Sequence, residues 1–221
     1  MQTNPGQERF NRWAQSYDRS ILQRLMFEPV HDAVLSAFRA SSAPAHDVLD
    51  VGCGTGRLLE TAAGRWDGVR FAGVDASEEM VEEARRKHEG DARFVFKQGD
   101  ASALPVESDS FDAVFSTMSF HHWRDQEAGI REVGRVLRPG GLFVLADVVV
   151  PFISLLRPLL RWSDHANFQG PKDIQGLLEQ ADLAVLTRRR FWALVRTQLF
   201  LARKGVPITR KGRDPGGVAA R

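Results

Sequence analysis

Val48-Leu49-Asp50-Val51-Gly52-Cys53-Gly54-Thr55-Gly56-Arg57-Leu58-Leu59 is the stretch that decides the fold. A short apolar run leads into three glycines at alternate positions, and a helical pattern follows. This order predicts a strand, a tight loop and the start of a helix, which in an open α/β sheet form a ligand site at the carboxyl end of the strand. The glycines permit backbone angles and a close ligand approach that a Cβ would block. We therefore expect a flat, polar ligand over this loop.

The glycine spacing and the acid before it indicate the charge of that ligand. A dinucleotide-binding loop reads G-x-G-x-x-G, whereas Arg57 stands where its third glycine would be. Asp50 precedes Gly52 by two residues, and its carboxylate favours a cation and repels a pyrophosphate. A cationic nucleoside such as S-adenosylmethionine, which carries a sulfonium and an ammonium group, fits this charge.

The stretch resembles motif I of the class I S-adenosylmethionine-dependent methyltransferases, an acid followed by G-x-G-x-G after the first strand. Four later segments resemble further parts of that family in the same order: Gly73–Ser77, Gln98–Ala101, Phe111–Ser116 and Arg135–Gly141. Together the segments cover about residues 44–150. The resemblance implies an α/β fold with a Rossmann-like, doubly wound, seven-stranded sheet. We expect it to be mostly parallel, with an antiparallel C-terminal hairpin and helices on both faces.

The resemblance also implies which residues bind S-adenosylmethionine. Asp75 would accept hydrogen bonds from both ribose hydroxyls; the alternative is a helix cap, but Ser77 can cap that helix alone. Asp100 and Ala101 would bind the adenine, whereas Met80 would lie against the adenine or in the core. The expected cofactor-binding residues are Tyr17, Asp50, Gly52, Cys53, Gly54, Gly56, Asp75, Ala76, Met80, Asp100, Ala101 and Ser116.

The N-terminal segment resembles a lid of the same family. Trp13, Tyr17 and Asp18 match the pattern W-x-x-x-Y-D, which in that family covers the cofactor. Packing of the aromatic residues on one helical face is the alternative. We expect a helical lid over residues 1–43, a methyltransferase domain over 44–204 with an apolar cap at 151–171, and a disordered basic tail from 205 to 221.

The residues after the predicted fourth strand are the candidates for chemistry. Methyl transfer from an activated donor needs positioning in a dry cleft rather than a catalytic triad. A hydroxyl acceptor also needs a base, and His121 or His122 could supply it. A hydrogen-bonded structural histidine is an equal alternative for His121. Because no cysteine or carboxylate cluster with ligand spacing stands beside these residues, we expect no metal.

The composition favours one domain and argues against several partners. The chain has 221 residues, 43% of them hydrophobic, and a net charge of +2. Residues 203–221 hold six basic side chains and one acidic one, so the remaining chain has a slightly negative net charge. This charge argues against a nucleic-acid-binding surface on the folded domain. A single cysteine excludes an internal disulfide. Charges and prolines interrupt the longest apolar stretch, which predicts no membrane span.

These observations predict a cytoplasmic enzyme, a monomer or homodimer, that methylates a small molecule. The residues His121-His122-Trp123 resemble a subgroup that includes quinone-biosynthesis methyltransferases, which makes an aromatic or lipid-like acceptor plausible. Two other functions remain open. The chain could bind S-adenosylmethionine or S-adenosylhomocysteine without turnover, or it could be a nicotinamide-dependent oxidoreductase, which Arg57 and Asp50 disfavour.

Overall fold

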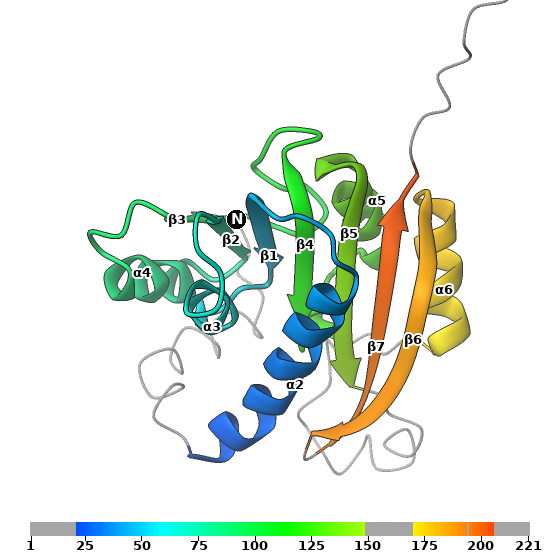
Figure 1. The fold of residues 1–221 in the computed structure, drawn as a ribbon, viewed down its shortest axis with the longest axis horizontal. Helices are drawn as coiled ribbons and strands as arrows, with labels where there is room; N and C mark the ends of the chain where they lie inside the picture. Colours follow the sequence, from blue (N-terminus) through cyan, green and yellow to red (C-terminus); the bar gives the residue numbers. More distant parts are fainter. Residues whose placement is uncertain (1–20, 149–169, 194, 206–221) are drawn as a thin grey trace, which may run out of the picture.

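The computed structural model describes residues 21–148, 170–193 and 195–205 (Figure 1). Its helices are α2 (Ile21–Ala40), α3 (Arg57–Ala63), α4 (Glu78–Lys87), α5 (Gln126–Val136) and α6 (Pro171–Gln180), with a short 3₁₀ turn, η1 (Phe120–His122). Its strands are β1 (Asp47–Val51), β2 (Arg70–Asp75), β3 (Phe94–Gln98), β4 (Phe111–Thr117), β5 (Leu137–Val148), β6 (Leu183–Ala193) and β7 (Val195–Lys204).

The strands form one seven-stranded sheet in the order β3-β2-β1-β4-β5-β7-β6. The pairs among β1 to β5 are parallel, and β7 runs antiparallel to both β5 and β6. The strand order reverses at β1, between β2 and β4, which is where an open α/β sheet binds its ligand. The predicted fold, including the antiparallel C-terminal hairpin, is therefore confirmed.

Two apolar clusters cover the two faces of the sheet. On one face, α2, α3 and α4 pack through fully buried side chains such as Val34, Leu59 and Val81. On the other, α5 and α6 contribute Ile130 and Leu178. Figure 1 shows α2 crossing the face formed by β4, β5 and β7. Because both faces are covered, the central strands β1, β4 and β5 are buried on both sides, as their apolar runs predict, whereas the edge strands β3 and β6 are largely exposed.

Two boundaries differ from the sequence-based expectation. Proline favours the first turn of a helix, which predicts that a helix begins near Pro29. Pro29 instead lies inside α2, where the packing of Val34 and Phe38 on the sheet outweighs the hydrogen bond that proline cannot make. The continuous apolar run from Leu142 predicts the start of the fifth strand, but β5 begins at Leu137. Its register against β4 shifts there, so the intervening Pro-Gly-Gly segment forms a bulge rather than a separate turn.

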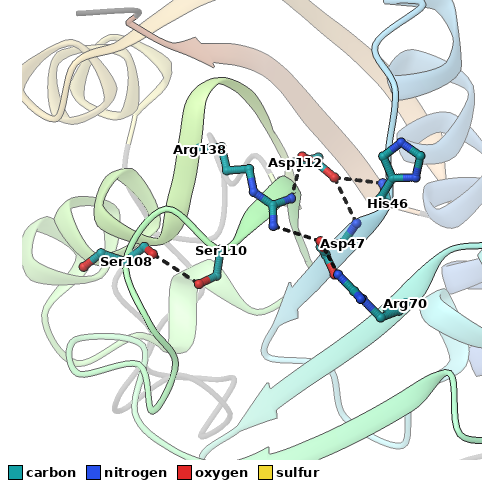
Figure 2. A network of polar contacts seen from close by, with 7 residues as sticks. All are labelled: His46, Asp47, Arg70, Ser108, Ser110, Asp112 and Arg138. Carbon is teal, nitrogen blue, oxygen red and sulfur yellow. Dashed lines mark hydrogen bonds and ion pairs between the residues drawn. The ribbon is translucent and has the colours of Figure 1, made fainter.

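Ion pairs tie together the amino-terminal edge of the sheet, opposite the predicted site (Figure 2). Arg138 of β5 bridges Asp112 of β4 and Asp47 of β1, at 2.7 and 2.9 Å. Asp47 also receives two hydrogen bonds from Arg70 of β2, and Asp112 accepts the backbone N–H of His46. The Arg70 hydrogen bonds hold the pKa of Asp47 below its usual value. This network, Asp47–Arg70–Asp112–Arg138, joins four strands where no ligand is expected.

In the described ranges, every helix is too short or too polar to cross a lipid bilayer.

Candidate functional site

The glycine loop runs from the end of β1 to the first turn of α3. Gly52 and Gly54 have φ angles of +77° and +53°, in the left-handed region that favours glycine. A Cβ on Gly52 would lie 2.2 Å from the Ser119 Oγ, so only glycine fits there. A Cβ on Gly54 would meet no atom within 4 Å, which leaves room for a ligand against that part of the loop. The structure therefore has the cradle that the glycine spacing predicts.

Asp50 is the most unusual residue beside this loop. It is 1% exposed, and its Oδ1 has no hydrogen-bond partner in the part of the chain that the structure describes. Burial, and then the negative charge of Asp75, raise the pKa of Asp50 to about 8. The side chain is therefore protonated at neutral pH. A buried acid without a partner costs stability unless a ligand completes it, which makes Asp50 a candidate for contact with a ligand.

Asp75 lies at the end of β2, beside the loop. Its Oδ2 accepts the Gly54 N–H at 2.8 Å, and its Oδ1 accepts the Ser77 N–H at 2.9 Å. Burial raises the pKa of Asp75, although these two N–H groups act in the opposite direction. Ser77 is itself the N-cap of α4 and accepts the Met80 N–H. The Ala76 N–H also acts on this carboxylate and opposes the rise in its pKa. Asp75 thus orders the glycine loop, and a carboxylate with about four acceptor positions can still accept from a ligand.

Four of the other expected cofactor residues follow β2 or β3 in the chain. Asp100 follows β3, and its Oδ1 accepts both the backbone N–H and the hydroxyl of Ser102. Ala76 is exposed between β2 and α4, whereas Ala101 is partly buried. Met80 is 3% exposed, so it packs in the core, which was the alternative to a contact with the adenine. A core position does not exclude that contact.

Cys53, within the loop, is buried. That burial raises the pKa of its thiol well above the ordinary value, so the side chain stays a neutral thiol.

Ser116 and Ser119 connect the glycine loop to the residues after β4. The Ser119 hydroxyl donates to the Val51 carbonyl at 3.0 Å, and Ser116 Oγ lies 2.9 Å from Ser119 Oγ. Because the Ser119 proton is used on Val51, the Ser116 hydroxyl is the donor of the second bond. Trp123 Nε1 also donates to Ser119 Oγ, at 3.3 Å. Through these bonds Ser119 holds the end of β1 against the residues after β4. It was not among the residues expected to bind the cofactor.

His121 forms a close pair with Asp147 at the carboxyl end of β5. Its Nδ1 lies 2.6 Å from Asp147 Oδ1, and its backbone N–H donates to Oδ2 at 2.9 Å. The Val148 N–H donates to Oδ1 as well. Asp147 is 2% exposed. A carboxylate can only accept, so His121 carries its proton on Nδ1 and, when neutral, its lone pair on Nε2. Asp147 was visible in the sequence as the one charge in the apolar run of residues 142–150.

The remaining predicted residues divide between the site and the part of the chain that is not described. The exposed His122 ring lies 4.0 Å from the His121 ring, centroid to centroid. Tyr17 lies outside the described residues, as do residues 1–20 of the predicted lid, 151–169 of the predicted cap and 206–221 of the predicted tail. The rest of the predicted lid, residues 21–43, contains α2, which packs on the sheet. Within the described ranges, no three His, Cys, Asp or Glu side chains are grouped to hold a metal ion.

Comparison with known proteins agrees with this geometry. The family model described as "Methyltransferase domain" matches residues 48–141. YcgJ, an uncharacterised methyltransferase of Bacillus subtilis (strain 168), is 31% identical over 196 residues, which cover 84% of this chain and 76% of that protein. This chain belongs to the methyltransferase family.

Two further proteins, one similar in sequence and one in fold, differ from this chain in length and source. An O-methyltransferase of Pyrenophora dematioidea is 36% identical over 53% of this chain and 44% of that protein. The chain spans about half the length of the curated relatives it matches. Magnesium protoporphyrin IX methyltransferase from Synechocystis PCC 6803, solved with bound SAH, shares the fold. Its TM-score is 0.71 at 20% identity, over 90% of this chain and 98% of that one.

Proposed function

We propose that this methyltransferase binds S-adenosylmethionine over the Gly52–Gly56 loop and transfers its methyl group to a hydroxyl of a small molecule. Asp50 is the observation that carries the proposal, because a buried carboxyl without a partner beside an open glycine cradle fits a cationic nucleoside. The SAH bound to the Synechocystis protein of the same fold supports this choice. The cofactor, when bound, supplies a methyl group already activated on a sulfonium.

Three acids of this chain would hold the cofactor. Asp50 would face the cationic methionine end, where an ammonium group would give it the partner that Oδ1 lacks. Asp75 would accept the ribose hydroxyls with its remaining lone pairs. Asp100 would accept the adenine amine with Oδ2, since its Oδ1 is used on Ser102. Tyr17 would cover the methionine end. Each acid follows or ends a different strand, so the three line one edge of the sheet.

His121 is the proposed general base. With its proton on Nδ1 held by Asp147, the neutral ring would accept the acceptor's hydroxyl proton at Nε2. The acceptor oxygen then forms its bond to the methyl carbon as the carbon–sulfur bond breaks. Such a base is useful for a hydroxyl and unnecessary for a free amine or an anion, so the pair favours O-methylation. His122 lies against the His121 ring and is the alternative base.

Calorimetric titration of the full chain tests the cofactor. We expect micromolar binding of S-adenosylmethionine and S-adenosylhomocysteine and none of NADH. Asp75→Ala should weaken binding at least about tenfold because two ribose hydroxyls and the Gly54 N–H lose their acceptor. Asp91→Ala is the matched control, since Asp91 contacts Arg93 in a turn away from the loop. Absence of binding by the wild-type chain would refute the proposal.

A further inference from the structure

Gln198 is a second buried polar side chain without a partner, and it lies outside the cofactor loop. It is 1% exposed, yet neither its Oε1 nor its Nε2 makes a hydrogen bond anywhere in the described part of the chain. An amide buried with no partner is costly, and native proteins keep few of them. Gln126, also buried, differs from Gln198 because its Nε2 donates to the Phe120 carbonyl at 2.9 Å.

The register of the sheet places Gln198 next to the proposed base. Gln198 of β7 pairs with Asp147 of β5, and directly paired residues of antiparallel strands point to the same face of the sheet. Asp147 holds His121 on that face. Arg190 of β6 pairs with Gln198 on its other side, so the row reads His121, Asp147, Gln198, Arg190. Neighbouring strands are about 4.8 Å apart, so Gln198 lies roughly one strand spacing from the Asp147–His121 pair.

We infer that Gln198 binds the acceptor and selects molecules that carry a carbonyl or carboxylate oxygen within about one strand spacing of the methylated hydroxyl. The inference rests on the proposed function and names its substrate class. The Gln198 Nε2 would donate to that oxygen, which gives the buried amide the partner that it lacks. Arg190, exposed at the end of the row, adds a positive charge that favours a carboxylate over a neutral group.

The stability of the ligand-free protein tests whether Gln198 is kept for binding. Gln198→Met keeps the volume and removes two unpaired polar atoms, so we expect its Tm to rise by roughly 2–8 °C. Gln126→Met is the matched control and should lower Tm, because it leaves the Phe120 carbonyl without its donor. A lower Tm for Gln198→Met would show a hydrogen-bonded structural glutamine and overturn the inference.

Turnover tests the substrate class. The probes are the three hydroxybenzoates, the matching hydroxybenzamides, and the cresols, in which a methyl group replaces the polar substituent; transfer is followed with labelled S-adenosylmethionine. We expect the benzoates and benzamides to be methylated in preference to the cresols. Gln198→Met should raise their KM about tenfold, leave S-adenosylhomocysteine affinity unchanged and remove the preference.

The outcomes separate this inference from the proposed function. Equal methylation of cresols, or a preference that survives Gln198→Met, overturns the role of Gln198 while the enzyme remains a methyltransferase. Failure of the wild-type chain to bind S-adenosylhomocysteine overturns the proposed function instead. If the cofactor binds and no probe is methylated, the Tm values of Gln198→Met and Gln126→Met decide the role of Gln198. A higher Tm for Gln198→Met supports the inference, and a lower one overturns it.

Discussion

Lowering the pH should weaken cofactor binding because it keeps Asp50 protonated. Burial and the neighbouring charge of Asp75 hold the pKa of Asp50 at about 8 in the free protein, so the carboxyl is neutral at pH 7. An ammonium group placed beside Oδ1 stabilises the carboxylate form and lowers that pKa. Binding at neutral pH must therefore expel a proton from Asp50, and affinity must rise with pH until Asp50 is ionised in the free protein.

The size of the effect follows from the pKa. With a free-state pKa of about 8, the ionisation of Asp50 alone would lower affinity about fiftyfold from pH 8 to pH 6, provided that the bound carboxyl stays ionised over this range. The ligand's α-amino group has itself lost about half or more of its charge at pH 8, so the net change should be about twentyfold, and binding at pH 7 should release about 0.8 proton. Above pH 8 the ligand's own amino group, whose pKa is near 7.7–8.0 in α-amino groups generally, loses its charge and affinity should fall again.

Isothermal calorimetry with S-adenosylhomocysteine measures both quantities. Titrations at pH 6, 7 and 8 give the affinities, and titrations at pH 7 in phosphate and in Tris give the proton release from the difference in apparent enthalpy. Adenosine, which lacks the ammonium group, should release no proton, and Asp50→Asn should lose the dependence below pH 8. Equal affinity at pH 6 and pH 8, with no proton release by the wild-type chain, would refute the assignment of Asp50 to the cation.

Three further predictions concern the base and the stability of the fold. Asp147→Asn should reduce kcat for a hydroxyl acceptor about 10²–10⁴-fold and leave the affinity for S-adenosylhomocysteine unchanged. The reason is that three N–H groups bond to the Asp147 carboxylate, whereas the Asn side chain has only one acceptor oxygen. Steady-state kinetics checks the first effect and calorimetry the second. Arg138→Ala should cost about 1–3 kcal/mol in urea unfolding and leave the cofactor site intact. Burial is the main cause that lowers the pKa of His31 to about 4. Because the unfolded chain then binds a proton at His31 more readily than the folded one, the fold should lose stability as the pH falls from 6.5 through 4. Melting curves of His31→Gln should lack this part of the pH dependence.

The cofactor loop was predictable because its signals are local. An apolar run, alternate glycines and a helical pattern require no knowledge of distant contacts, and each β–α turn of a parallel sheet brings its acid to the same edge. Local pattern and charge pointed to Asp50, whereas the roles expected of Asp75 and Asp100 came from the resemblance to the family. The same local patterns predicted the strands, but packing and a bulge moved some of their ends and those of the helices, for example at Pro29 and Leu137.

Only the tertiary structure shows the contacts between residues that are far apart in the sequence. Asp147 stood out as a charge in an apolar strand, but its bond to His121 depends on how η1 packs on β5. Nothing near Gln198 in the chain indicates that it is buried without a partner beside Asp147, because cross-strand neighbours are set by register and a shift of one residue would turn it to the other face. The glycine pattern in the sequence predicts where the ligand binds. The protonation state of Asp50 could not be read from the sequence, because burial in the folded sheet is what raises its pKa.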